Sequence, residues 1–309
     1  MADILQVTLP VNTPAVFHRP SDFIKDAIFL SHSSLSDFQK CRRAYYLKNV
    51  YRDGVHGYKL LITSPYLSLG SLVHDTIHWY FTRSENPTPE QTIRQFRLFW
   101  GKFRGKRGGF TTVEDEAVFG KRGLSMLDNF LKNTAVLGQG MPTASFPNFT
   151  IEDNLVFTGN MDYVEKLPDG SLHVVDFKTG AKDEDGPTQL YLYALMAENF
   201  YRRPVKKASF WYLDRESAPR EVVLESREQT FRWLLERARQ VKEAWQENKW
   251  VCTHPNPPCR DCRDYEAILE GKGEFMFTDE RYKKEVYFLD RSESAQVVSA
   301  DNGTSAKVL

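Results

Sequence analysis

The spacing of apolar residues changes near the middle of the chain. In the first part it follows the period of amphipathic helices, and Ser34-Leu35-Ser36-Asp37 has the Ser-x-x-Asp form of a helix start. Helices are expected over Ser34–Val50, Leu69–Phe81, Gln91–Lys106 and Val113–Leu137. Residues 1–30 carry several prolines and no clear period, which indicates an extended lead-in. The first part is therefore predicted to be mostly helical.

Beyond residue 140 the pattern switches to short segments rich in β-branched and aromatic residues. Strands are expected over Phe149–Phe157, Thr158–Leu167, Ser171–Lys178, Lys207–Leu213 and Glu221–Leu224. Pro168-Asp169-Gly170 marks a turn between the second and third strands. Helices are expected from Pro187 to about Tyr201 and after Ser226, whose Ser-x-x-Gln spacing has the form of a capping box. This pattern predicts an α/β fold of the mixed (α+β) kind, with a mixed sheet, flanking helices and an N-terminal helical region.

Composition is that of an ordinary globular protein. The chain has 309 residues, of which 41% are apolar and 27% are charged. It has no run of about 18 apolar residues, and the first residues lack the basic and apolar stretches of a secretion signal. We therefore expect a cytoplasmic protein with no membrane partner. Basic and acidic residues balance at 41 each, so a nucleic-acid binder of this composition needs a local basic path.

An acid and a lysine lie side by side at the end of a hydrophobic strand. In segment 172–178, alternation places Asp176 and Lys178 on one face. Asp162 lies on the preceding strand, and a hairpin at the Pro-Asp-Gly turn can bring it close to Asp176. Two nearby carboxylates repel each other, and a divalent cation such as Mg²⁺ removes that penalty. The structural alternative is a surface ion pair between Asp176 and Lys178.

Two further pairs of residues share helix faces. Gln189 and Tyr193 are four residues apart on the helix after the strand, so their side chains lie on one face. Gly70 and His74 lie on an earlier helix, where the glycine permits a close backbone approach and the imidazole offers a ligand atom. Each pair alone is more often core or surface filler, because short motifs are only hypotheses.

In this order the motifs resemble those of the RecB-like branch of the PD-(D/E)XK nucleases, which includes CRISPR-associated and AddB-type exonucleases and phage nucleases. The matching motifs are Gly70-x-x-x-His74, Gly159-Asn160-Met161-Asp162, Asp176-Phe177-Lys178 and Gln189-x-x-x-Tyr193. The resemblance covers residues 31–265, and Met161 stands where the family name has proline. One such motif is a weak signal, whereas four in order are specific. The resemblance implies a restriction-endonuclease-like core.

The resemblance also implies roles for the motif residues. The ligands of Mg²⁺ or Mn²⁺ would be His74, Asp162, Asp176 and the carbonyl oxygen of Phe177. The metal would polarise the scissile phosphate and lower the pKa of a bound water. Lys178 would orient that water or neutralise charge on the phosphate. Gln189 and Tyr193 would contact the nucleic-acid strand.

Four cysteines occur, and clustered cysteines in a reducing compartment more often bind metal than form disulfides. They are Cys41, Cys252, Cys259 and Cys262. The segment around Cys41 resembles the first-cysteine motif of iron–sulfur RecB-like nucleases, although Arg42 replaces a frequent proline. Three C-terminal cysteines complete the cluster in those relatives. Their usual last cysteine is missing here, and Cys252 would substitute for it. Four thiolates suit a 4Fe-4S cluster, with Zn²⁺ or no metal as alternatives.

With this core and these cysteines, the chain is expected to divide into five segments. They are an extended lead-in (1–30), a helical region with the first cysteine and the His motif (31–140), the nuclease core (141–250), a Cys-rich metal-cluster segment (251–268) and a C-terminal tail (269–309). From about Arg291 the tail is rich in serine and lacks aromatic residues, so it is expected to be partly disordered.

A basic and aromatic run without an acid spans Gln91–Val113. The candidate nucleic-acid-binding residues in it are Arg94, Arg97, Trp100, Lys102, Arg104, Lys106 and Arg107. Phosphates attract the charges and bases stack on rings, so the run is a candidate path for a single strand. The structural alternative is a solvated helix whose aromatic residues belong to the core.

These features predict a metal-dependent DNA exonuclease that acts on single strands or DNA ends, in recombination, repair or phage DNA metabolism. Its partners would be DNA and a helicase or recombination protein. An endonuclease or an RNase on the same scaffold is the second enzymatic hypothesis. A non-catalytic nucleic-acid-binding subunit of a helicase–nuclease complex is the rival from another class. The intact Asp162, Asp176 and Lys178 argue against that rival.

Overall fold

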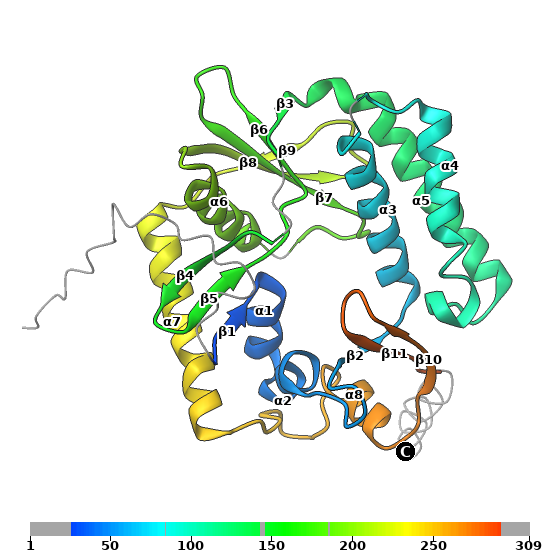
Figure 1. The fold of residues 1–309 in the computed structure, drawn as a ribbon, viewed down its shortest axis with the longest axis vertical. Coiled ribbons are helices and arrows are strands. Elements are labelled where there is room, and N and C mark those ends of the chain that lie inside the picture. Colours follow the sequence, from blue (N-terminus) through cyan, green and yellow to red (C-terminus); the bar gives the residue numbers. More distant parts are fainter. Residues whose placement is uncertain (1–25, 84, 143–145, 185, 292–309) are drawn as a thin grey trace, which may run out of the picture.

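The predicted mixed α/β fold is confirmed. A computed structural model of the protein describes residues 26–83, 85–142, 146–184 and 186–291 (Figure 1). The α-helices are α1 (His32–Lys40), α2 (Arg42–Tyr45), α3 (Pro65–Phe81), α4 (Pro89–Trp100), α5 (Val113–Asn133), α6 (Thr188–Tyr201), α7 (Arg227–Glu247) and α8 (Arg263–Leu269). Shorter helical turns are η2 (Tyr46–Val50), η3 (Gly105–Gly108) and η4 (Thr134–Val136). None of the helices in these ranges has the length and apolar character needed to cross a bilayer.

The strands of the described residues form one larger and two smaller sheets. They are β1 (Ile28–Leu30), β2 (Lys59–Ile62), β3 (Gln139–Gly140), β4 (Asn148–Glu152), β5 (Leu155–Thr158), β6 (Tyr163–Lys166), β7 (Leu172–Lys178), β8 (Val205–Tyr212), β9 (Arg220–Val222), β10 (Glu274–Asp279) and β11 (Lys284–Phe288). The larger sheet has the order β3-β6-β7-β8-β9, with β7 antiparallel to β6 and parallel to β8. Parallel neighbours need a crossover connection, and α6 provides it between β7 and β8.

Helices cover both faces of the larger sheet, which makes three layers (Figure 1). Val174 on β7 packs with α6 and α7, whereas Val175 and Phe177 pack with α3, α4 and α5. The first six residues of β7 are all buried, as a strand covered on both faces requires. The predicted alternation along residues 172–178 is therefore confirmed, and Asp176 is buried near the carboxyl end of the central strand.

Two small sheets join segments that are distant in the sequence. One has the order β1-β5-β4, and the other has the order β10-β11-β2, in which β11 runs parallel to β2. The sequence analysis did not predict β1, β2, β10 or β11. They are short, and their neighbours lie far away in the sequence or, for β10 and β11, in a segment assigned to the tail. The expected disorder beyond Arg291 and most of the lead-in lie outside the described residues.

Several predicted elements are divided in the structure. The helix expected over 34–50 begins at His32, with Ser31 as its N-cap, and breaks at Cys41, whose backbone is extended at φ −162° and ψ 119°. The helix expected over 91–106 ends at Trp100. The strand expected over 149–157 is a hairpin that turns at Asp153, which has a positive φ of 41°. These breaks set the direction of the chain at the cysteines and beside the acidic residues.

Candidate active site and cysteine cluster

Two predicted acids meet at the end of the central sheet. The register of β6 and β7 pairs Tyr163 with Val175, so Asp162 lies just outside the ladder, beside Asp176. Asp176 is only 3% exposed. Burial and then the negative charge of Asp162 raise the pKa of Asp176 to about 7. The pair is costly as two bare carboxylates, so this part of the molecule is suited to a cation.

His74 on α3 faces this acidic pair. Its Nδ1 lies 2.9 Å from Oδ1 of Asp162, and the other oxygen of Asp162 accepts the N–H of Phe177 at 2.9 Å. Burial opposes a charge on His74, but the charges of Asp162 and Asp176 outweigh it and raise the pKa of His74 to about 9. Without a metal, the imidazole therefore carries a proton near neutral pH and supplies part of the missing positive charge.

Lys178 completes a hydrogen-bonded network on the same face of β7. Its Nζ lies 3.0 Å from Oδ2 of Asp176 and donates to Oε1 of Gln189 at 2.6 Å. Nε2 of Gln189 donates to Oδ1 of Asp176 at 3.0 Å and to the hydroxyl of Tyr193 at 3.2 Å. Burial raises the pKa of Tyr193, which is 8% exposed. The four residues thus fix one another, and Tyr193 supports Gln189 from the protein interior.

Two motif glycines lie where backbones approach closely. A Cβ on Gly70 would come 3.2 Å from Oγ1 of Thr179, the residue after β7. A Cβ on Gly159 would come 3.1 Å from Cε1 of Tyr193. Both contacts are tighter than ordinary van der Waals packing, so the glycines let α3 and the loop before β6 close on the site.

Two residues that the sequence analysis did not select also lie near Lys178. Oε1 of Glu184 lies 3.0 Å from Nζ of Lys178. His32 on α1 is close enough that burial, followed by the charge of Lys178, lowers the pKa of its imidazole. Neither residue belongs to a recognisable motif, and His32 is far from β7 in the sequence. No local signal could have identified them.

In chemical type the donor set suits a divalent cation, although among the described residues its ligand atoms do not converge within 4.8 Å as those of the four cysteines do. His74, Asp162 and Asp176 offer an imidazole and carboxylate oxygens, which suit Mg²⁺ or Mn²⁺. The raised pKa values of His74 and Asp176 show a local excess of negative charge that a cation would relieve. In this arrangement the Asp176 carboxylate is engaged by Lys178 and Gln189.

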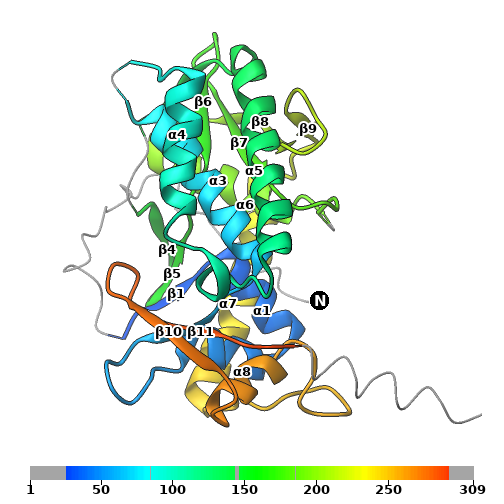
Figure 2. The same cartoon turned by 90° about the vertical axis from the view of Figure 1, so that its right-hand side faces the viewer.

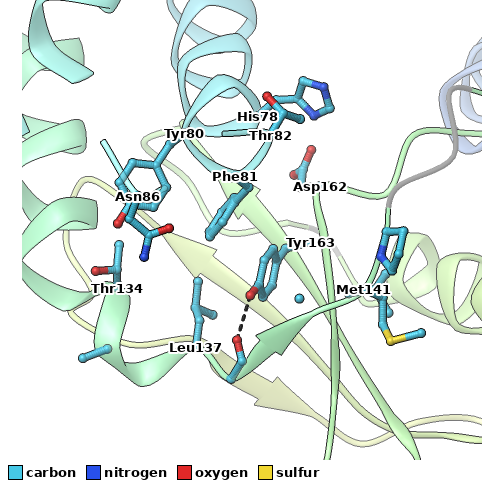
Figure 3. Close-up of a pocket in the computed structure, with 15 residues that line it drawn as sticks. His78, Tyr80, Phe81, Thr82, Asn86, Thr134, Leu137, Met141, Asp162 and Tyr163 are labelled. Atoms are coloured by element: carbon cyan, nitrogen blue, oxygen red, sulfur yellow. Dashed lines mark hydrogen bonds between the residues drawn. The ribbon is translucent and has the colours of Figure 1, made fainter. Parts of the chain in front are cut away.

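Asp162 lies where two cavities meet. One, of about 770 Å³, is lined by the end of α3, including His78 and Phe81, and by the segment that contains Leu137 and Met141 (Figure 3). The other, of about 550 Å³, is lined by the exposed face of α3 and by β10 and β11. Asp162 therefore borders both cavities, whereas the buried Asp176 lines neither of them.

The family profile of the PD-(D/E)XK nuclease superfamily matches residues 29–267. The chain belongs to this superfamily. The match begins in β1 and ends in α8, so it includes the central sheet and all four cysteines. Membership supports a metal-dependent nuclease activity. No curated protein matches the chain.

The structure brings the four cysteines of this nuclease-superfamily protein together. Their Sγ atoms all lie within 4.8 Å of one another, and those of Cys259 and Cys262 are 3.7 Å apart. The break between α1 and α2 directs Cys41 into the group, where its Sγ accepts the N–H of Ala44 at 3.5 Å. Burial raises the pKa of Cys41 and of Cys262. Four converging thiols fit a metal or a cluster that binds them as thiolates.

Aliphatic and charged contacts enclose this cysteine cluster. Ala44 and Leu47 pack against it from α2 and η2. Arg43 bonds both carboxylate oxygens of Glu266 on α8, at 2.5 and 3.1 Å. The cluster therefore joins the beginning of the described chain to the segment that leads into β10 and β11.

The basic run is only partly available to a ligand. Nε of Arg104 lies 3.0 Å from Oε1 of Glu116, and Nζ of Lys106 lies 2.6 Å from Oε2 of Glu274. Arg107 lies over the ring of Phe277, 4.1 Å from its centroid, and lines the 550 Å³ cavity. The basic run contains no acidic residue, but Glu116 and Glu274 from other segments form ion pairs with it.

The other residues of the run lie on or next to α4. Arg94, Arg97 and Lys102 are exposed. Trp100 packs between Phe96 and Phe110, with ring centroids 5.4 and 5.6 Å apart. Its ring thus contributes to packing between α4 and the segment before α5, as the structural alternative for this run expects.

Proposed function

We propose that this protein is a metal-dependent DNA exonuclease that hydrolyses phosphodiester bonds on single strands or at DNA ends. The network of Asp162, Asp176 and Lys178 at the end of the central strand carries the proposal. A nuclease fold that serves only to bind nucleic acid has no need to keep these three charged side chains together at the end of one strand. The meeting of two cavities at Asp162 favours a strand as the substrate.

Each residue of the network has a distinct part in the proposed reaction. His74, Asp162, Asp176 and the carbonyl of Phe177 would hold Mg²⁺ or Mn²⁺. When bound, the metal polarises the phosphate and lowers the pKa of a water ligand. The ammonium of Lys178 neutralises charge that builds on the phosphate. Gln189 holds both Asp176 and Lys178, and a side chain fixed in advance needs little reorganisation.

A 4Fe-4S cluster is the proposed occupant of the four cysteines, with Zn²⁺ as the alternative. The convergence of four Sγ atoms within 4.8 Å supports a tetrathiolate site. Cys252 is the fourth cysteine of this group. It would replace the last cysteine of the related iron–sulfur nucleases, which this chain lacks. Anaerobically purified protein is expected to be brown and to contain iron and sulfide. Stoichiometric zinc would support the alternative, and absence of both metals would exclude a metal at this site.

A cleavage assay on matched substrates tests the proposed activity. Labelled linear single strands, linear duplexes, closed circles and RNA are incubated with Mg²⁺, with Mn²⁺ or with EDTA. We expect short products from linear single strands or duplex ends, none from circles and none in EDTA. Cut circles would show an endonuclease, and preferential cleavage of RNA would show an RNase. Binding without cleavage under every metal condition would favour the non-catalytic subunit.

A further inference from the structure

One face of the sheet β10-β11-β2 lines the 550 Å³ cavity. The parallel register pairs Lys284 with Lys59 and Val286 with Leu61, so these four side chains share a face. Leu61, Lys284 and Val286 all line the cavity. The opposite face carries Leu60 and Ile62, which pack with Ile268 of α8. The sheet thus presents one face to the protein interior and the other to the cavity next to the active site.

Two lysines lie side by side on the cavity face. Lys59 and Lys284 are register partners on adjacent strands, and like charges in that position destabilise a sheet. The charged neighbours that act on Lys59 are Arg52 and Lys284, both of them cations, while Asp279 is the charged group that acts on Lys284. Burial lowers the pKa of both lysines. An anion bound beside the pair would offset this repulsion.

Arg107 faces the same cavity from the other side. Its guanidinium stacks on Phe277 of β10. The backbone around it is fixed, because Thr63 donates to its carbonyl at 3.1 Å. Gly109 follows with a φ of 82°, and a Cβ there would lie 2.4 Å from Cα of Ser64. Arg107 is therefore held on a turn that packs directly against the start of α3.

Exposed aromatic rings border these cations. Tyr66 on α3 and Tyr282 in the β10–β11 turn also line the cavity, and they are 68% and 55% exposed. Exposed rings beside cations suit a nucleic-acid strand whose bases are unpaired, because free bases can stack while phosphates meet the charges. Asp75 and Asp279 line the cavity too, and Asp279 is the cross-strand partner of Lys284, so Arg107 is the cation of this wall on which a phosphate depends most.

We propose that this cavity is the track along which a single nucleic-acid strand reaches the active site. Its phosphates contact Arg107 and Lys284, and its bases stack on Tyr66 and Tyr282. The cavity already contains His74 and Asp162, so the track is continuous with the metal ligands proposed above. Figure 2 shows the β10–β11 hairpin beneath the ends of α3 and α4. This inference rests on the proposed nuclease function and adds the surface that takes the substrate.

Binding of a fluorescein-labelled oligothymidylate, measured by anisotropy in EDTA at several salt concentrations, tests the track. Arg107→Gln/Lys284→Gln is compared with Arg104→Gln/Lys106→Gln. Both pairs remove two positive charges, but Arg104 and Lys106 are already paired with Glu116 and Glu274. The first variant should lose affinity on the order of tenfold at low salt, and its log–log salt slope should fall by about 0.7 per contact. The second should change much less.

Two further readouts separate a role in binding from a role in folding or chemistry. Lys284→Gln alone should change the melting temperature little, because it relieves the repulsion with Lys59 and also removes the attraction of Asp279. Cleavage by Arg107→Gln/Lys284→Gln at saturating strand should approach the wild-type rate, with a raised KM. Equal losses in the two double variants, or unchanged binding in the first, would overturn the track. A wild-type protein that binds the strand through these residues but cleaves nothing would instead refute the nuclease function.

Discussion

The candidate active site and the cysteine cluster hold their residues in different ways. Asp162, Asp176 and Lys178 lie on or just outside two adjacent strands whose backbones are hydrogen-bonded to each other. The cluster joins Cys41 to residues 252–262 across most of the chain, and packed side chains, the stacking of Trp250 on Tyr45 and Tyr46 and the Arg43–Glu266 ion pair accompany it. Secondary structure therefore positions the first set, and tertiary packing alone positions the second.

The two regions also differ in charge, and this difference decides what a bound metal contributes. The active site is rich in carboxylates that are already tied to Lys178, His74 and backbone N–H groups. A metal bound there would add reactivity to side chains that hydrogen bonds and ion pairs already hold in place. The cysteines lie in a largely apolar setting, and the stacking of Trp250 on Tyr45 and Tyr46 also joins their segments. A metal bound there would add to the free energy that holds the segments together.

The largest expected effect is on catalysis. Asp176→Ala and Lys178→Ala should each reduce metal-dependent DNA cleavage by at least about a hundredfold, because each removes a charge next to the scissile phosphate. Asp169→Asn is the matched control, since it changes an exposed acid in the same hairpin that pairs with Lys206. Initial rates on labelled DNA measure the effect, and circular dichroism checks the fold. Near wild-type rates in the first two variants would place the chemistry elsewhere.

A large effect on stability is expected at the other region. Cys262→Ser should lose the bound metal and lower the free energy of unfolding by several kcal/mol, because a structural metal stabilises only the folded chain. Asp176→Ala should keep its metal at the cysteines. Elemental analysis and denaturant unfolding of both variants make the comparison direct. A Cys262→Ser protein as stable as the wild type would show that packing alone joins these segments.

A smaller effect should appear in the pH dependence of stability without metal. The pKa of Asp176 is raised from its usual 3.8 to about 7, and that of His74 from 6.5 to about 9. The folded state therefore binds more protons than the unfolded chain, so stability falls as pH rises through this window, by an amount on the order of several kcal/mol. Thermal melts in EDTA measure the fall. Asp176→Asn should reduce the fall in stability at the lower end of this pH range, and saturating Mg²⁺ should reduce the whole fall. A stability that rises with pH would contradict the charge balance described here.

The smallest effect is expected from Tyr193→Phe. It removes the hydroxyl that accepts from Gln189 at 3.2 Å, a hydrogen bond that contributes about 1 kcal/mol. If Tyr193 only positions Gln189, kcat should fall severalfold while DNA affinity is unchanged. A change confined to DNA affinity would instead show that Tyr193 contacts the strand. Steady-state kinetics and strand binding, measured on the same preparation, distinguish the two outcomes.

The sequence by itself determined the central features of the site. Alternation over residues 172–178 predicted a strand with Asp176 and Lys178 on one face, and the Pro-Asp-Gly turn predicted the hairpin that brings Asp162 near. Helix spacing placed Gln189 and Tyr193 together. These relations are local, because the period of a strand, a turn or a helix fixes which neighbouring side chains share a face.

Only the tertiary structure decided the rest. Pairing of β2 with β11, which makes the cavity wall, joins residues from opposite ends of the described chain. The ion pairs of Arg104 with Glu116 and of Lys106 with Glu274 appear only in the tertiary structure. Such contacts have no sequence period, because they depend on how separately formed elements pack. A basic side chain that has no acidic neighbour in the sequence is therefore unpaired in the folded protein only if no carboxylate from a distant segment packs against it.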